Sequence, residues 1–421
     1  MLLLSDDDRA MLAGERGLAP QLAMSILVRM AEVYGASELM DISQAHIDST
    51  IYLGDATLEF AERLASLGAR VAVPTSLNVS GVDECGWKDW AVKAEWAAKA
   101  ARQMLAYESM GAVPTWTCAP YQTHMRPVFG QQIAWGESNA IAFANSVIGA
   151  RTERYPDLLD ICCAIAGRVP AVGLHLTEHR AGEMLLRLDH VPEALQQDDQ
   201  FFAVLGHLTG ERAGDRIPVI DGIVAKPSED QLKAFAAAAA SSGRVALFHM
   251  VGITPEAPTL DTAFQGKAPP AAIAVTVEEL RAARRELTTA DGRELDMVIL
   301  GSPHFSLAEF SLLAPLVSGR HAHPGVKFLI TSSRLMKEHA QEKGVLEPVV
   351  AFGAQITLDT CILASPMLPP EIRTLMTNSA KYAYYAPNLL DTRVTFGSLA
   401  DCVNSAVEGR VVRDESVWLQ A

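Results

Sequence analysis

Short apolar runs alternate with helical segments along most of this chain, and this alternation is its strongest constraint on fold. The apolar runs are bounded by Gly, Pro or polar residues, as buried parallel strands are; they are 71–75, 172–176, 245–250, 297–301, 326–330 and 354–360. Helical periodicity covers 19–34 and 88–109. The pattern predicts an α/β protein with parallel-type sheets flanked by helices.

The length predicts more than one lobe. A chain of 421 residues exceeds the size at which a single hydrophobic core stops growing, and 49% hydrophobic with 20% charged residues is ordinary for a globular protein. An Ala-rich helix over 234–240 and a Pro-containing loop over 253–273 set one region apart. We expect an inserted second lobe at approximately 190–290.

Charge and the first residues exclude several classes of function. The formal charge of −15, from 50 acidic and 35 basic residues, would repel a phosphate backbone, so nucleic acid is not expected as a partner. The start, MLLLSDDDRAML, is neither a signal peptide nor a membrane span. Six Cys without a CxxC pair do not form a disulfide framework. We therefore expect a cytoplasmic enzyme with free thiols and no membrane contact.

Small polar groups follow several of the expected strands. Open α/β sheets bind ligands at the carboxyl ends of their strands, so one polar pocket could collect these groups. The alternative is that Ser and Thr there only cap helices, as Ser306 and Glu309 are expected to do in a capping box. The groups proposed as substrate contacts are Thr75, Ser76, Asn78, Thr331 and Ser332, and Ser302, His304 and Cys361 follow strands in the same way.

Two helical segments carry further candidates. Within 135–152, small apolar residues at helical spacing predict a helix that opens with Glu137, Ser138 and Asn139 and ends at Gly149. Arg151 lies just past its end and is a candidate clamp for a carboxylate. Helix capping and a surface arginine are the alternative. In 377–387, Lys381 could lie near a substrate anion or transfer a proton if it is desolvated. Its alternative is a solvated lysine on a helix whose tyrosines pack.

Three cysteines lie far apart in polar segments, which suits soft-metal ligands brought together by folding. They are Cys118 in TWTCAPY, Cys361 in TLDTC and Cys402 in SLADCVNSA. Cys162 and Cys163 are adjacent in an expected helix and are interpreted as small core residues. The spacing of His321 and His323 also permits a zinc pair.

Several longer motifs resemble the catalytic part of the aconitase X family, in order and over nearly the whole chain. They are PTSLNVSGVD (74–83), TWTCAPY (115–121), WGESNAIAFANSVIGARTERYPD (135–157), GSPHFSLAEF (301–310), TSSR (331–334), LDTC (358–361), TNSAKYAYYAP (377–387) and FGSLADCV (396–403). The resemblance implies one aconitase X catalytic region over 1–421 and an aconitase-like, multi-lobed fold.

The resemblance also implies a hydro-lyase with an iron-sulfur cluster. Cys118, Cys361 and Cys402 would be its ligands, and three thiolates would leave an iron open for a substrate hydroxyl. His304 would assist proton transfer, with Ser302 and Lys381 as the other catalytic candidates. Archaeal members that act on mevalonate 5-phosphate commonly have Cys where this chain has Ser302. That difference argues against a four-iron cluster and favours a two-iron cluster.

The same resemblance implies cis-3-hydroxy-L-proline as the substrate and a pyrroline-2-carboxylate as the product, with mevalonate 5-phosphate as the alternative. Nothing after residue 403 resembles the small swivelling domain of the family, which carries a serine proposed as the base. A separate small subunit is therefore expected as a partner. Alternatives from other classes are a zinc-dependent hydrolase that uses His321 and His323, and a non-catalytic scaffold subunit.

Overall fold

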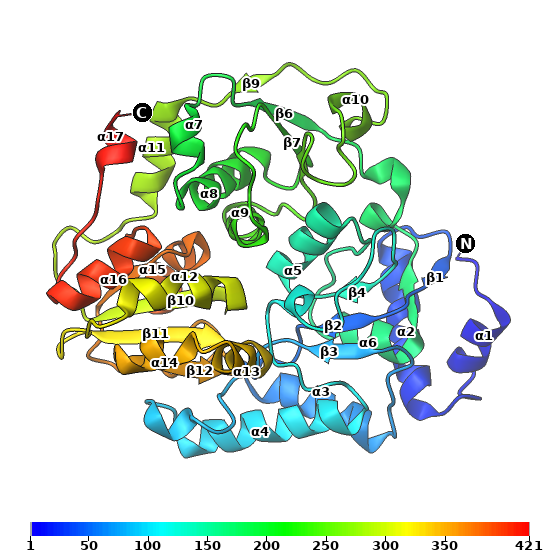
Figure 1. The fold of residues 1–421 in the computed structure, drawn as a ribbon. Helices are drawn as coiled ribbons and strands as arrows, with labels where there is room; N and C mark the ends of the chain where they lie inside the picture. Colours follow the sequence, from blue (N-terminus) through cyan, green and yellow to red (C-terminus); the bar gives the residue numbers. More distant parts are fainter. Residues whose placement is uncertain (1, 421) are drawn as a thin grey trace.

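Three α/β units form the fold in the computed structural model, which describes residues 2–420 (Figure 1). Each unit is built around a parallel sheet, in agreement with the fold class expected from the alternation of apolar runs and helices. No helix in the described part of the chain is long and apolar enough to cross a membrane.

The first unit contains a three-stranded parallel sheet in the order β3-β2-β4 and an antiparallel pair of β1 and β5. Helices α3 and α4 pack together along one side of it (Figure 1). Its elements are α1 (Asp6–Leu12), α2 (Leu18–Val33), β1 (Leu39–Asp41), β2 (Ala45–Ile47), α3 (Asp55–Ser66), β3 (Thr75–Leu77), α4 (Ala94–Ser109), β4 (Ala134–Trp135), α5 (Ser138–Phe143), α6 (Leu159–Ala166) and β5 (Arg168–Pro170).

The second unit falls between residues 184 and 286 and has a parallel sheet in the order β8-β7-β6-β9. Helices α8 and α9 pack against each other beside it. Its elements are β6 (Met184–Arg187), α7 (Glu193–Gln196), α8 (Phe201–Ala213), β7 (Pro218–Asp221), α9 (Glu229–Ser242), β8 (His249–Met250), α10 (Leu260–Ala263), β9 (Ile273–Ala274) and α11 (Val277–Glu286).

The third unit is a five-stranded parallel sheet in the order β12-β11-β10-β13-β14. The chain runs outward from β10 to β12 and then returns to the other side of β10, so the strand order reverses between β10 and β13. Its elements are β10 (Met297–Phe305), α12 (Leu307–Val317), β11 (Lys327–Ser332), α13 (Arg334–Glu342), α14 (Leu346–Ala351), β12 (Ala354–Leu358), β13 (Thr374–Thr377), α15 (Ala380–Leu389), β14 (Arg393–Phe396) and α16 (Leu399–Glu408), followed by α17 (Ser416–Gln420).

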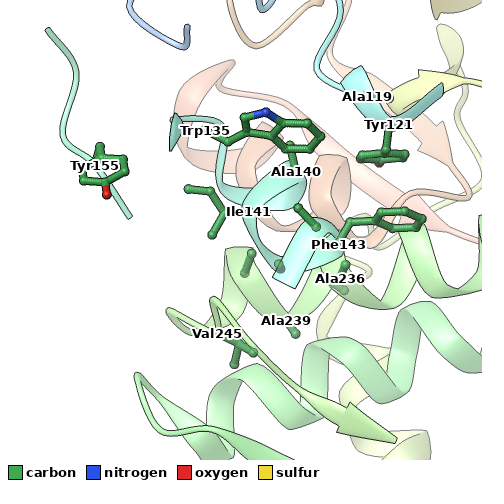
Figure 2. Close-up of a cluster of buried hydrophobic side chains, with 14 of the residues drawn as sticks. Ala119, Tyr121, Trp135, Ala140, Ile141, Phe143, Tyr155, Ala236, Ala239 and Val245 are labelled. Carbon is green, nitrogen blue, oxygen red and sulfur yellow. The ribbon is translucent and has the colours of Figure 1, made fainter. Parts of the chain in front are cut away.

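Helix α9 lies at the centre of the molecule and joins the three units (Figure 1). It packs against α5 of the first unit and α15 of the third. Small residues allow the helices to approach closely: Ala236 and Ala239 of α9 lie beside Ile141 and Phe143 of α5 (Figure 2). The Phe143 ring also stacks on Tyr121, with 3.9 Å between the ring centroids.

Several expected elements were confirmed, and others were wrong. Strands β10, β11 and β12 and helices α2 and α4 lie where the sequence predicts them, and Ser306 and Glu309 form the expected capping box of α12. The expected strand at 172–176 is instead a 3-10 turn around Gly173, whose φ of 52° turns the backbone out of an extended path. In the runs 71–75 and 245–250 only the last one or two residues are strand.

The contact between α8 and α9 depends on Gly206. A Cβ atom there would lie 2.5 Å from the carbonyl oxygen of Phe235, a backbone atom that cannot move independently of α9. Helix propensity alone would make Gly206→Ala stabilising by about 1 kcal/mol. We expect destabilisation by about 1–3 kcal/mol instead, because the two helices must move apart. Urea unfolding of both proteins measures the difference, and a higher midpoint for the variant would contradict this packing.

Candidate functional site

The carboxyl ends of two sheets face each other across the boundary between the first and third units. In the first unit, Asp48 directly follows β2, Asn78 directly follows β3, and Glu137 lies two residues after the end of β4. In the third unit, the point where the strand order reverses lies between the ends of β10 and β13, where open α/β sheets bind ligands. Ser302 lies within the last residues of β10, and Lys381 lies in the first turn of α15, just after β13.

Glu137 and Lys381 connect the two edges through an ion pair. The Nζ atom of Lys381 lies 2.8 Å from Oε1 of Glu137, and both side chains are about one-tenth exposed (11% and 10%). Glu137 also accepts hydrogen bonds from the side-chain amides of Asn139 (2.6 Å) and Asn78 (3.2 Å). Burial opposes the charge on each partner. The pairing nevertheless lowers the pKa of Glu137 to about 2 and raises the pKa of Lys381 above its ordinary value.

Cys118 and Cys361 face one cavity of about 150 Å³ beside this ion pair. The cavity is lined by Ile51, Val79, Cys118, Glu137, Ser302, Cys361, Leu363, Ala364, Lys381, Tyr385 and Leu389. Burial raises the pKa of the Cys118 thiol to about 12 and also raises that of Cys361. Two thiols of this kind become thiolates only beside a strong cation. Thiolate sulfur is the donor that iron-sulfur groups bind in proteins, so these two side chains are the candidate ligands within the cavity.

A second cavity of about 320 Å³ shares Ser302 and Lys381 with the first. It lies between α9 of the second unit and the ends of β10 and β13, and Lys233, Asn378 and Ser379 also line it. The two cavities are therefore neighbours, and together their linings form the candidate site.

His304 fixes the segments that carry the two cysteines. Its Nε2 donates to the carbonyl oxygen of Thr360 (3.1 Å), and its Nδ1 lies 3.1 Å from the hydroxyl of Thr117, so the ring contacts the residue before each cysteine. Its backbone N–H donates to Sγ of Cys118 at 3.3 Å. Burial lowers the pKa of His304 to about 4, so the ring is neutral at pH 7. Both ring nitrogens have partners, so in this structure His304 holds the two cysteine segments in place, and its role in proton transfer stays a prediction.

The loop of Cys361 is held by a second network. The guanidinium of Arg334 donates to both carboxylate oxygens of Asp359, at 2.8 and 2.7 Å. Thr360 donates its hydroxyl to the carbonyl oxygen of Ser80 (2.7 Å), and Asp83 accepts from the backbone N–H of Leu358 (2.9 Å). Residues 80–83 of the first unit therefore determine where Cys361 lies.

Comparisons with known proteins show the family and the fold of the chain. Family models described as the first, second and third domains of aconitase X match residues 1–178, 182–285 and 295–408. The chain belongs to the aconitase X family. The crystal structure of Thermococcus kodakaraensis aconitase X in its holo-form superimposes with a TM-score of 0.85 at 31% identity, over 96% of this chain and 100% of that chain.

Two groups of curated aconitase X relatives are similar to this chain. It is 49% identical to the cis-3-hydroxy-L-proline dehydratase of Pseudomonas aeruginosa over 98% of its own length and 71% of the relative's. The dehydratase of the same name from Hypocrea jecorina is 44% identical over 96% and 69%. The phosphomevalonate dehydratase large subunit of Methanothermobacter thermautotrophicus is 36% identical over 92% and 94%.

Cys402 does not join the other two cysteines. It lies on α16 with no exposed surface, in an apolar cluster with Val298, Leu313 and Val403. Cys118 and Cys361 belong to a different cluster, with Val79 and Ala364. Among residues 2–420 the expected set of three thiolates is thus not assembled, because α16 turns Cys402 into the core of the third unit. Cys162 and Cys163 are fully buried, as expected of core residues.

Other sequence candidates have structural partners. Ser76 pairs with His46 between β3 and β2 (2.8 Å), Thr75 donates to Val73, and Ser332 donates to Phe305. Thr331 donates to the carbonyl oxygen of Gly301, and Ser138 lies beside Glu137. Arg151 donates to His175 and Thr177 and does not line the cavities. Of the expected substrate contacts, Glu137 lines a cavity and Asn78 supports it.

The Nδ1 atoms of His321 and His323, whose spacing permits a zinc pair as an alternative, both contact backbone groups. Nδ1 of His321 lies 3.2 Å from the carbonyl oxygen of Ala351, and Nδ1 of His323 accepts from Gly325. In the described part of the chain, three side chains that could bind one metal ion lie close together in the second unit, and neither His321 nor His323 is among them.

Sequence reasoning missed a charged cluster at the edge of the second cavity. Lys233 of α9 is 2% exposed, pairs with Asp230 (2.8 Å) and Glu309, and donates to the carbonyl oxygen of His304 (3.4 Å). Although burial opposes its charge, the two carboxylates raise the pKa of Lys233. In the sequence, the expected capping box of Ser306 and Glu309 was the only indication of polar residues at this position. It did not indicate that a lysine from another unit would pair with Glu309.

Removing one partner of the Glu137–Lys381 ion pair leaves the other charge buried and unpaired. We expect Glu137→Gln to lower the free energy of unfolding by about 3 kcal/mol or more, because Lys381 then stays buried without its carboxylate. The double variant Glu137→Gln/Lys381→Met recovers part of this loss, since neither charge remains. Urea unfolding of Glu137→Gln, Lys381→Met and the double variant gives a double-mutant cycle. Additive effects of the two substitutions on the free energy of unfolding would contradict a direct interaction.

Proposed function

We propose that this chain is the catalytic large subunit of an iron-sulfur hydro-lyase that dehydrates cis-3-hydroxy-L-proline to a pyrroline-2-carboxylate. The observation that carries the proposal is the convergence of Cys118, Cys361, Glu137, Ser302 and Lys381 on one small cavity where two sheets meet. The 49% identity to a dehydratase of that substrate, against 36% to a phosphomevalonate dehydratase, supports the choice of substrate.

The reaction requires two bonds to break. The α-carbon loses its proton and uses the electron pair to form the C=C bond, while the 3-hydroxyl leaves and takes up a proton as water. An iron-sulfur cluster supplies a Lewis acid for the departing oxygen. In this chain, Cys118 and Cys361 would hold the cluster. Ser302 and Tyr385 are the hydroxyl-bearing side chains in the lining of the small cavity, and Ser302 also lines the larger one.

Lys381 is suited to bind the substrate carboxylate. Its raised pKa keeps it cationic at pH 7, so it is not a base, and Glu137 fixes its ammonium group at the junction of the two cavities. Ammonium and carboxylate groups form strong charge-assisted hydrogen bonds in a buried site. The α-proton would then be removed by a group from outside the described set, which agrees with a site completed by a partner.

A small swivelling-domain subunit is the proposed partner. Relatives with the other substrate are named large subunits, which implies a small one. Apolar side chains line the openings of both cavities: Leu312 is 62% exposed at the larger and Leu389 is 60% exposed at the smaller. Exposed apolar residues around a polar site are typical of a protein interface. A reducing cytoplasm would keep the two thiols available for the cluster.

Charge in the cavities argues against the phosphorylated substrate. Among the described residues that line them, the cations are Lys381 and Lys233, and each already pairs with a carboxylate. Mevalonate 5-phosphate carries a carboxylate as well as a phosphate. With Lys381 assigned to the carboxylate, the phosphate would meet only Lys233, which already pairs with two carboxylates. A monocarboxylate with an amino group fits this balance better.

The substrate assignment can be tested with the chain together with its small subunit. We expect turnover of cis-3-hydroxy-L-proline, followed as formation of the pyrroline product, and at least about a hundredfold lower kcat/KM for mevalonate 5-phosphate, equivalent to about 2.7 kcal/mol in transition-state binding. A preference for the phosphorylated substrate would contradict the charge argument, and turnover of neither would contradict the proposed function.

Cysteine variants test the ligand assignment. We expect Cys118→Ser and Cys361→Ser each to abolish the visible absorption of the cluster together with turnover, because a hydroxyl is a poor ligand for iron in place of a thiolate. Cys402→Ser is the matched control: it changes the same atom in the apolar core and should keep both properties, with lower stability. Loss of the cluster in Cys402→Ser but not in Cys361→Ser would reverse the assignment.

A further inference from the structure

Three potential metal ligands meet outside the cavities, on α8 and α11 of the second unit. His207 and Glu211 are four residues apart on α8 and so project from one face of the helix. Glu286 is the last residue of α11, which packs on α8. One ligand atom from each side chain lies within 4.8 Å of the other two. The Nε2 atom of His207 is 3.8 Å from a carboxylate oxygen of Glu211 and 3.5 Å from one of Glu286.

The imidazole points into this group without a hydrogen bond. His207 is 3% exposed, and its buried Nε2 has no hydrogen-bond partner among the described residues. Burial lowers the pKa of His207, so the ring is neutral at pH 7. A buried ring nitrogen left unsatisfied costs free energy that a ligand would recover. It therefore points to a missing partner.

Among residues 2–420, neither carboxylate pairs with a lysine or arginine, and their nearest basic group is the His207 ring. Burial raises the pKa of Glu211, and the neighbouring charge of Glu286 raises it further. Arginines on the same helices are engaged elsewhere: Arg212 pairs with Glu279 and Arg285 pairs with Glu278. A neutral imidazole and two mutually repelling carboxylates at this spacing are matched by a divalent cation.

We propose that His207, Glu211 and Glu286 bind one divalent transition-metal ion of the zinc class, with water completing its coordination. One imidazole nitrogen and two carboxylate oxygens are ordinary zinc ligands, whereas calcium and magnesium favour sites made of oxygen alone. The carboxylates reach solvent, which gives the ion an entry path. This site is separate from the proposed iron-sulfur site and does not depend on the proposed reaction.

The position of the ligands indicates a structural role for the ion. Directly after Glu286 the chain enters the third unit, where Thr289 donates its backbone N–H to Val394 of β14. The ring of Tyr384, from α15 of the third unit, lies 5.9 Å from that of His207. An ion here would hold α8 and α11 together at the point where the second and third units meet. Helix α9, which packs on α8, forms a wall of the larger cavity.

Zinc titration of the purified enzyme by calorimetry tests the proposal. We expect the wild type to bind one more Zn²⁺ per chain than Glu211→Gln/Glu286→Gln, or to bind it at least about tenfold more tightly. The matched control is Glu338→Gln/Glu342→Gln, which removes two exposed carboxylates at the same spacing on α13 and should behave as the wild type. Zinc bound at the cysteines contributes equally to all three proteins and cancels from the comparison.

Two further measurements distinguish an ion site from a surface acidic cluster. His207→Gln keeps both carboxylates and should lose the same zinc equivalent; unchanged binding in that variant overturns the proposal. Added Zn²⁺ should raise the melting temperature of the wild type and not that of Glu211→Gln/Glu286→Gln, which without metal should be at least as stable as the wild type because the carboxylate repulsion is gone. Equal zinc uptake by the wild type and this double variant also overturns it.

Discussion

The buried ion pair of Glu137 and Lys381 is the contact on which the arrangement of the site depends. Its partners are 244 residues apart and lie at the carboxyl ends of two different sheets. Charges removed from water are costly, and their attraction compensates only when the remaining hydrogen-bonding capacity is filled. Asn139 and Asn78 fill that capacity for Glu137. The first and third units are thus held at one separation, and that separation defines the cavity.

Strand β10 positions two of the candidate site residues, Ser302 and His304. It continues for nine buried residues, beyond the point where its pairing with β11 is regular. Gly301 permits the irregularity: its φ is 95°, and a Cβ atom there would lie 2.1 Å from the carbonyl oxygen of Thr331. After Gly301, Ser302 lines both cavities. His304 contacts Thr117 and Thr360, the threonines that precede the two cysteines. A single strand end therefore sets the distance between two thiols from different units.

The sequence was informative where elements are long or chemistry follows a strand. Apolar runs of five or more residues predicted β10 and β11. Ser302 was selected because it follows a strand, and Glu137 and Lys381 because each lies near the start of a helical segment; the structure places all three on one cavity, and their roles stay predictions. Asp48 was missed because β2 has only three residues, too few for a pattern to emerge. The partners of His304 were missed because hydrogen bonds between Thr117, Thr360 and His304 join segments that no local pattern connects.

The placement of Cys402 was, by contrast, readable from the sequence. Leu399, Cys402, Val403 and Ala406 recur at i, i+3, i+4 and i+7, the spacing of one buried helix face. The polar residues next to Cys402 in the sequence lie on the other faces of that helix. Polar neighbours in the sequence therefore did not mean that the Cys402 side chain has polar surroundings in the fold. Cys118 and Cys361 lie outside helices and strands, where no such periodicity assigns a side chain to the core.

If the proposed cluster binds in the small cavity, the charge balance there would couple its binding to that of the substrate. Glu137 and Lys381 cancel, and the raised pKa values of Cys118 and Cys361 keep both thiols protonated, so the walls are close to neutral. A bound metal would displace the two thiol protons, since thiolates are its ligands. The resulting negative charge would lie beside Lys381 and compete with the substrate carboxylate for it. Glu137 limits that competition, because it fixes the ammonium group at the junction with the larger cavity, on the side from which a substrate would enter.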